Sequence, residues 1–145
     1  MSKIIGNTTA TPYPRPDWNQ TDETKVDYIK NKPNDYVVEQ GTSDIWTYRI
    51  WNSGVVECWG IHTFTGGVNT LKGGIYVGER EFIALPTNLF AEKPMVNITS
   101  EIEANEGIIL ACTDEVSATG IFVVPASTIS YVNATVYYHI ELKGK

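Results

Sequence analysis

The stretch that decides the fold is residues 44–60, Asp44-Ile-Trp-Thr-Tyr-Arg-Ile-Trp-Asn-Ser-Gly-Val-Val-Glu-Cys-Trp-Gly60. It predicts two strands joined by a tight turn at Asn52-Ser-Gly54, because Gly54 can adopt a positive φ without steric cost. Side chains alternate between two faces along a strand. One face of the first strand is therefore expected to carry Trp46, Tyr48 and Ile50. A hairpin this rich in aromatic residues is an expected starting point for a β-sandwich, and we expect both Trp46 and Trp59 to be structural core residues.

Short strand-like runs follow the hairpin at close spacing, and no helical pattern separates them. This arrangement predicts an antiparallel β-sandwich of jelly-roll type over residues 41–145. The run 107–113 is apolar on both faces, which favours a central strand. The glycine-rich run 65–74 is interpreted as a mobile connection, since it lacks the residue order of a phosphate-binding loop. The closing strand is expected to direct inward Val136, Tyr138, Ile140 and Leu142.

The first 40 residues predict an N-terminal attachment arm with one short helix. Pro12, Pro14 and Pro16 alternate with other residues, which favours an extended segment without sheet hydrogen bonds. A helix is expected over about residues 21–31, starting at a Thr21 or Asp22 N-cap and stopped by Asn31 and Pro33. Its apolar stripe is narrow, so a helix this short is marginal unless something covers it.

Composition excludes several classes of function. The 145 residues carry a formal net charge of −6, and the eleven Lys and Arg residues are scattered, so no nucleic-acid surface is expected. No apolar run is long enough to span a bilayer, and no secretory signal is visible. Cys58 and Cys112 are expected to be unpaired buried thiols, with a disulfide as the alternative. The two His residues show no ligand spacing to either Cys, so we expect no metal and no cofactor.

Two kinds of residue could carry a function. Carboxylates are numerous, and two of them could form a hydrolytic pair, although most lie in polar turns where solvated carboxylates are usual. These are Glu79, Glu81, Glu101, Glu103, Glu106, Asp114 and Glu115. Tryptophan and tyrosine rings can also stack on sugars, or they can pack in a core or between subunits. The candidates for a glycan or interface contact are Tyr48, Trp51 and Tyr137.

Two segments carry a resemblance to a known family. Pro16-Asp-Trp-Asn-Gln-Thr-Asp-Glu-Thr-Lys-Val-Asp-Tyr-Ile-Lys-Asn-Lys-Pro33 closely resembles a segment that recurs in tail and fibre proteins of phages and prophages. Residues 46–60 are similar to the tryptophan-rich opening of phage fibre tip domains, and residues 137–145 look like their closing strand. The residues that the resemblance assigns to virion attachment are Trp18, Asn19, Asp27, Tyr28, Ile29, Asn31 and Pro33.

The resemblance implies a homotrimeric, non-enzymatic virion protein of the tail-fibre or baseplate class. Its arm would bind other virion proteins, and its β-rich domain would bind a host-surface glycan or a neighbouring virion protein. No shaft-like repeat precedes the motif, which favours a short accessory or tip protein. The alternatives are a phage-borne glycan-degrading enzyme and a bacterial carbohydrate-binding module.

Overall fold

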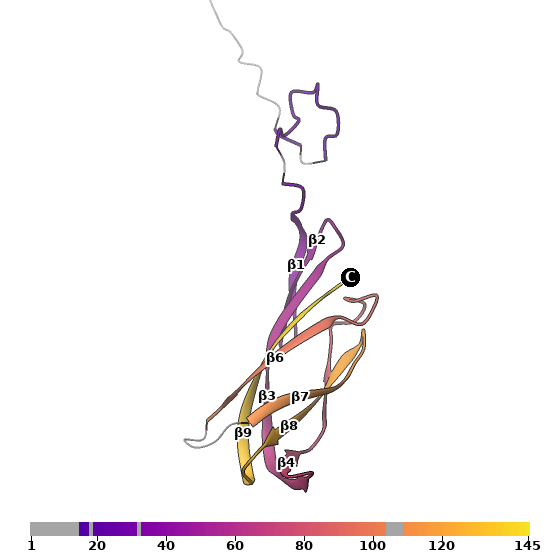
Figure 1. Cartoon of the computed structure of the whole chain (residues 1–145). Helices are drawn as coiled ribbons and strands as arrows, with labels where there is room; N and C mark the ends of the chain where they lie inside the picture. Colours follow the sequence, from indigo (N-terminus) through magenta and orange to yellow (C-terminus); the bar gives the residue numbers. More distant parts are fainter. Residues whose placement is uncertain (1–14, 18, 32, 104–108) are drawn as a thin grey trace, which may run out of the picture. The chain divides into compact units, whose positions relative to one another are not determined.

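The computed structural model describes residues 15–17, 19–31, 33–103 and 109–145. Contacts divide the chain into two compact units, Met1–Asn34 and Asp35–Lys145. All nine strands belong to the second unit, and none of the described residues is helical (Figure 1). The all-β prediction is therefore confirmed for the described part of the chain.

The short helix expected over residues 21–31 is absent. Backbone hydrogen bonds in this segment join each donor to the third residue before it, from Lys25 N to Asp22 O (3.2 Å) and from Tyr28 N to Lys25 O (3.2 Å), so the chain forms turns. Asp22 Oδ1 also accepts the Thr24 backbone N–H at 3.0 Å, which is a local bond that competes with helix formation. Val26, on the expected apolar stripe, is exposed, so burial does not offset the cost of forming a short helix.

The second unit consists of nine strands connected in chain order. The bounds of the strands are β1 Val37–Ser43, β2 Trp46–Trp51, β3 Val56–Lys72, β4 Ile75–Gly78, β5 Glu81–Ala84, β6 Met95–Ile102, β7 Ile109–Val116, β8 Gly120–Ser127 and β9 Tyr131–Gly144. The expected hairpin is confirmed as β2 and β3. Its turn contains Gly54 at φ 79°, and the Gly54 N–H donates to Trp51 O at 2.8 Å.

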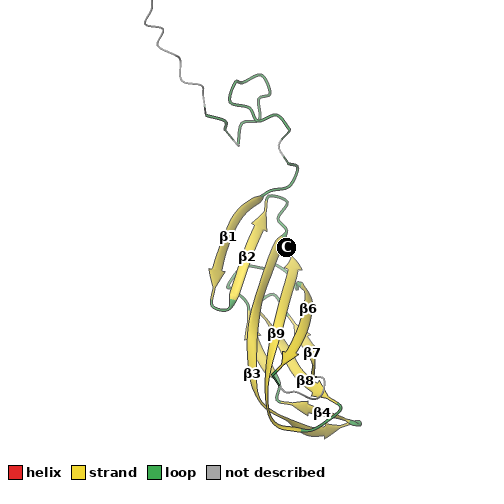
Figure 2. Ribbon diagram, turned by 90° about the vertical axis from the view of Figure 1, so that its left-hand side faces the viewer, coloured by secondary structure: helices red, strands yellow, loops and turns green. Residues whose placement is uncertain are grey.

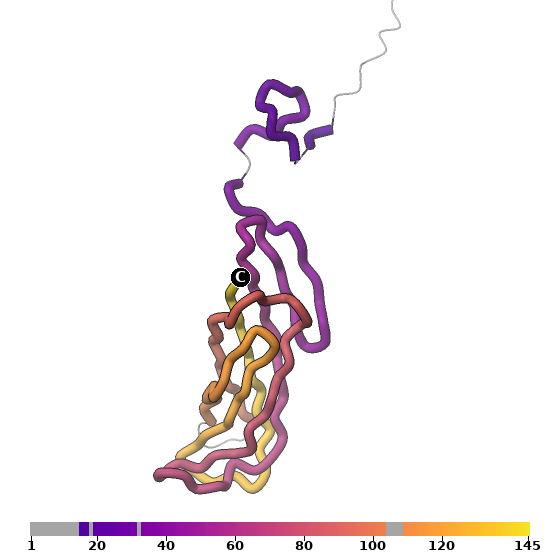
Figure 3. Tube along the Cα trace, turned by 90° about the vertical axis from the view of Figure 1, so that its right-hand side faces the viewer, coloured from indigo at the N-terminus to yellow at the C-terminus, as the bar shows by residue number. Residues whose placement is uncertain are grey.

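All the strand pairs are antiparallel and belong to one curled sheet (Figure 2). The path β1-β2-β3-β4-β8-β5 is joined by β9, which pairs with both β3 and β6, and by β7, which pairs with β8. The long pair of β3 and β9 runs from Val56↔Gly144 to Val68↔Tyr131 and forms the spine of the domain. The β3–β4 and β8–β9 turns lie at the same end of it (Figure 3). The antiparallel prediction is confirmed, whereas this pairing does not confirm a jelly-roll topology.

The core lies inside the curl of the sheet. The closing strand directs its alternate residues inward as expected, with Val136, Tyr138, Ile140 and Leu142 all buried. Trp46 is 2% exposed, and its indole N–H donates to Ala84 O at 2.7 Å, which connects β2 to the end of β5. The other core side chains include Val56, Cys58, Phe64, Val68, Ile83, Phe90, Ile121 and Val123.

Two expectations about individual segments are wrong. The glycine-rich run 65–74 is mostly the end of the long strand β3, and only Gly73 and Gly74 form its turn, at φ 58° and 90°. Gly66 leaves room for the Phe64 ring inside this strand, since a Cβ at position 66 would lie only 3.0 Å from that ring. Strand β7 was expected to be central, but it pairs only with β8, and its residue Leu110 is 61% exposed. Within the described residues, no helix could cross a bilayer.

Candidate functional site

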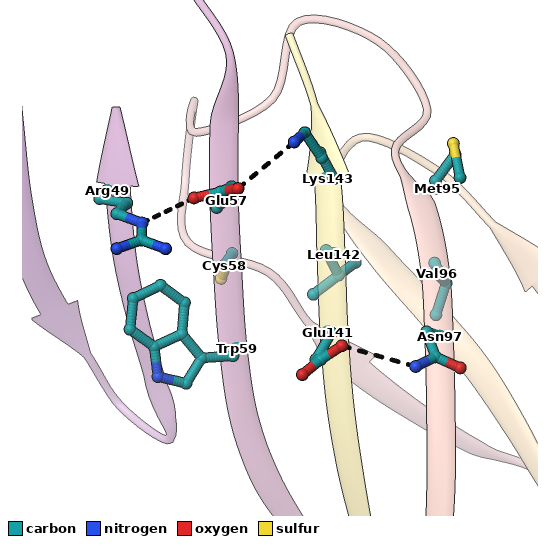
Figure 4. A pocket seen from close by; sticks show the side chains of 10 residues that line it. All are labelled: Arg49, Glu57, Cys58, Trp59, Met95, Val96, Asn97, Glu141, Leu142 and Lys143. Carbon is teal, nitrogen blue, oxygen red and sulfur yellow. Dashed lines mark hydrogen bonds and ion pairs between the residues drawn. The ribbon is translucent and has the colours of Figure 1, made fainter. Parts of the chain in front are cut away.

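The outward face of strands β2, β3, β9 and β6 is a hollowed surface (Figure 4). The registers of the three strand pairs align residues of all four strands in rows across this face. One row consists of Arg49, Glu57, Lys143 and Met95, and the next consists of Thr47, Trp59, Glu141 and Asn97. The hollow over these rows has a volume of about 480 Å³.

Glu57 is the centre of a charged network at one side of this hollow. Its Oε2 accepts hydrogen bonds from Arg49 Nε at 2.6 Å and from Trp51 Nε1 at 2.9 Å, and Lys143 Nζ lies 3.4 Å from Oε1. The hydrogen bonds from Arg49 and Trp51 lower the pKa of the Glu57 carboxyl from its ordinary value. One ionised carboxylate therefore holds two cations and one indole in place.

Trp59 supplies the aromatic surface of the hollow. Its side chain is 39% exposed, and the Arg49 guanidinium lies 5.4 Å from its ring centroid. Across β9, on the neighbouring strand β6, Asn97 Nδ2 donates to Glu141 Oε2 at 3.5 Å. An exposed indole faces a region with amide and carboxylate groups, which is a combination suited to binding a polyhydroxylated ligand.

The three aromatic candidates from the sequence do not form one site. Trp51 lies on the face of the hollow, where its ring is 5.3 Å from the Arg49 guanidinium. Tyr48 belongs to the opposite alternation of β2, opposite buried Cys58, and its hydroxyl donates to Glu39 at 3.2 Å. Tyr137 is on the same face of β9 as Glu141 but four residues before it, and it donates to Glu103 at 2.5 Å.

Trp59 was missed as a site residue because it was expected to be buried with Trp46. The register places Trp46 opposite Gly60, so Trp59 lies on the other face of the sheet. The sequence contained a signal for this difference, since the charged residues Arg49 and Glu57 alternate onto the same face as Trp59. A face with an ion pair among its aromatics is more often exposed than a face with only apolar residues.

The proposed attachment segment is a set of turns held by short polar contacts. Asp17 N donates to Asp27 O at 2.9 Å, and Asn19 N donates to Asp17 Oδ1 at 2.9 Å. Tyr28 donates its hydroxyl to Glu23 Oε1 at 3.3 Å, and Asn31 adopts φ 62°. In the same segment, Ile29 is half-buried and Pro33 is exposed, whereas Trp18 lies outside the described residues.

The acidic candidates are mostly engaged in ion pairs and hydrogen bonds. Arg80 binds both Asp114 (2.5 Å) and Glu115 (3.1 Å), and Glu103 accepts the Tyr137 hydroxyl. Glu79 and Glu81 line a second, more polar hollow of about 400 Å³. Glu106 lies outside the described residues.

Both histidines have an acidic partner. His62 Nε2 lies 3.1 Å from Glu81, and His139 Nε2 lies 3.1 Å from Glu101. Each imidazole is therefore held against one carboxylate. Among the residues that the structure describes, no three His, Cys, Asp or Glu side chains are grouped to bind a metal ion.

Comparison with known proteins identifies a class of fold. No family profile and no curated protein matches this chain. Among solved structures, it is similar to the R1 pyocin fibre of P. aeruginosa, residues 323–701, with a TM-score of 0.56 and 12% identity. The similarity covers 74% of this chain but only 28% of that fibre fragment. An N-truncated R1-type pyocin tail fibre is similar at a TM-score of 0.49 and 13% identity, over 70% of this chain and 83% of that one. The β domain therefore shares its fold with part of a tail fibre.

Proposed function

We propose that this chain is a non-enzymatic structural protein of a phage or phage-like tail, in the tail-fibre or baseplate class. It acts as a homotrimer within the virion. Its β domain binds a host-surface glycan or a neighbouring virion protein, and its N-terminal arm attaches it to other virion proteins. The observation that carries this proposal is the fold shared with the R1 pyocin fibre.

Exposed apolar side chains support the association of several copies. Phe82 of β5 and Leu110 of β7 are both more than half exposed, and both pair with residues on the same side of β8, Phe122 and Ala126. This face is opposite to the one that buries the β8 residues Ile121 and Val123. Such apolar groups on one surface are typical of a protein interface.

The homotrimer is tested by measuring the mass of the purified protein in solution. Multi-angle light scattering at micromolar concentration is expected to give about three times the chain mass of 16.1 kDa. Leu110→Asp would place a charge on the apolar face, so we expect it to lower this mass. Leu71→Asp is the matched control, because Leu71 is 62% exposed at the end of the β3–β4 hairpin. A monomer mass for the unaltered chain would contradict the trimer.

Attachment through the arm is tested separately. We expect a chain with Asp27→Ala and Tyr28→Ala to keep the trimer mass but to be lost from purified tail particles, as detected by immunoblotting. The reason is that these two residues lie in the segment that resembles the attachment motif. The substitutions remove side-chain contacts of its turns, which join Gln20 Nε2 to Asp27 Oδ1 at 3.3 Å and the Tyr28 hydroxyl to Glu23 Oε1 at 3.3 Å. If the substituted chain is incorporated into tail particles as well as the unaltered chain, attachment through the arm is contradicted.

A further inference from the structure

The hollow over β2, β3, β9 and β6 has the size and chemistry of a small-molecule site. Its volume of about 480 Å³ is within the usual range for ligand pockets, roughly 300–1,000 Å³. It lies over four hydrogen-bonded strands, so the backbone beneath it is held by pairing on both sides of β3 and β9. A site on paired strands keeps its side chains at fixed spacings.

Trp59 is available to a ligand in a way that Trp46 and Trp51 are not. The indole N–H groups of Trp46 and Trp51 donate to Ala84 O and to Glu57, whereas within the described residues Trp59 Nε1 has no such partner. The Trp59 ring is also 39% exposed next to the hollow. An apolar ring face with a free donor at its edge suits the C–H face and the hydroxyls of a sugar.

The polar groups around Trp59 include acceptors and donors with remaining capacity. Only one oxygen of Glu141 is used by Asn97, at a long 3.5 Å, and a carboxylate has about four acceptor positions. The Asn97 amide carbonyl oxygen is a further acceptor. Arg49 donates through Nε to Glu57, and its guanidinium carbon lies 5.4 Å from the Trp59 ring centroid, which places the terminal NH groups near the same ring. Sugar hydroxyls both donate and accept, so they can bind all of these groups.

The charge of the hollow favours a neutral ligand. Arg49 and Lys143 contribute two positive charges, and Glu57 and Glu141 contribute two negative charges. Both cations already bind Glu57, so an anionic ligand would have to compete with that carboxylate and approach Glu141. The net charge of −6 on the chain repels anions further at long range.

We propose that this hollow is a saccharide-binding site for a neutral glycan, with the sugar ring stacked on Trp59 and its hydroxyls bound by Asn97, Glu141 and Arg49. The inference rests on the proposed function for the source of the saccharide, which is the host cell surface. It adds the position of the site and the chemical class of the ligand.

The test is a titration of the full chain with defined saccharides, in which binding is measured by saturation-transfer NMR. The probes are methyl glycosides and short oligosaccharides of glucose, galactose, N-acetylglucosamine and rhamnose, together with galacturonic acid oligosaccharides as anionic counterparts. We expect saturable binding of at least one neutral probe and weaker binding of the anionic ones. Trp59→Ala is expected to weaken binding at least tenfold, which corresponds to about 1.4 kcal/mol.

Matched variants separate binding from folding. Ile61→Ala is the control, because Ile61 is on the same face of β3 two residues further along, is 52% exposed and does not line the hollow. Asn97→Ala should weaken binding, and Ile61→Ala should leave it unchanged. Thermal unfolding of each variant shows that the domain is intact.

Four outcomes would overturn the inference. The first two are the absence of binding to every neutral probe and stronger binding of the anionic probes. The third is unchanged saccharide binding by Trp59→Ala. The fourth is a lower mass of the protein in solution for Trp59→Ala, which would identify the face as a contact between copies. The proposed function is judged by different measurements. A trimer that is built into tail particles but binds no saccharide would refute only this site, and a monomer that binds a neutral saccharide through Trp59 would refute only the fibre role.

Discussion

At the scale of single residues, two tryptophans of one hairpin have opposite environments. Trp46 is 2% exposed and hydrogen-bonded to Ala84 O, whereas Trp59 is 39% exposed. Trp46→Ala should therefore lower the free energy of unfolding by about 3–5 kcal/mol, as for other buried aromatic residues. Trp59→Ala should lower it by about 1 kcal/mol or less, as is common for surface positions. Urea unfolding of both variants measures the difference, and equal losses would contradict these assignments.

The tryptophans also show what alternation can predict. The alternation within each arm placed Trp46 on one face with Tyr48 and Ile50, because side-chain direction in a strand depends only on position. The faces of Trp46 and Trp59 differ because Trp46 lies opposite Gly60 in the register of β2 and β3. The alternation did not show which face the rest of the sheet would cover. That depends on how β9 and β5 pack against the hairpin, which involves residues about 40 to 90 positions away. The prediction that Trp59 is a core residue is therefore wrong, and the one for Trp46 is confirmed.

The two cysteines should differ strongly in reactivity. Both are unpaired, but Cys58 is buried and Cys112 is exposed, which corrects the expectation that both are buried. Burial raises the pKa of the Cys58 thiol to about 12, so at pH 8 almost none of it is the reactive thiolate. Iodoacetamide at pH 8 should add one label to the folded chain and two to the denatured, unreduced chain.

A control identifies the labelled cysteine. Cys112→Ser should abolish labelling of the folded chain and leave one label after denaturation. Rapid labelling of Cys58 in the folded chain would mean that the β3–β9 region opens readily.

At the scale of elements, two glycines of the hairpin constrain it differently. Gly54 needs a positive φ of 79°, but a Cβ there would contact nothing within 4 Å. Gly60 needs space, because a Cβ there would lie 2.6 Å from the Ile45 backbone oxygen. Gly54→Ala should cost about 1–2 kcal/mol from backbone strain alone. Gly60→Ala should cost more, since the clash is with backbone that must shift for the strands to stay paired.

Unfolding in urea and hydrogen exchange distinguish the two glycine effects. Gly54→Ala should destabilise the domain while the amide protection pattern of β2 and β3 is kept. Gly60→Ala should also reduce protection at Trp46 and its neighbours. A smaller loss of stability for Gly60→Ala than for Gly54→Ala would contradict the role of close packing.

The two elements that sequence reasoning missed have different physical causes. The helix expected over residues 21–31 rested on capping and charge signals, but Asp22 and Gln20 use their side chains in local turn bonds instead. The glycine-rich end of β3 read as a loop, yet its partner strands β9 and β4 supply backbone hydrogen bonds to it. In this glycine-rich segment, pairing with distant strands overrides the local propensity for a loop.

At the scale of the whole molecule, the sequence predicted the class of fold better than its topology. Dense short strands and the absence of a second helical pattern were enough for an antiparallel all-β domain. The single curled sheet depends on β9 pairing with both β3 and β6, and β9 follows β3 by about 60 residues. No local pattern encodes a pairing at that separation. The hollow over those strands was not predictable for the same reason.

The last prediction concerns the division of the chain at Asn34 and Asp35. Among the described residues, every strand and every residue of the buried core belongs to Asp35–Lys145, while the first unit consists of turns in which no described residue is fully buried. A fragment of residues 35–145 should therefore unfold in one cooperative transition, with a melting temperature within about 2 °C of the full chain, because such a shift corresponds to well under 1 kcal/mol for a domain of this size. Differential scanning calorimetry of both chains at equal concentration provides the measurement. A fall of many degrees would show that residues 1–34 stabilise the domain or its oligomer, and their role would then extend beyond attachment.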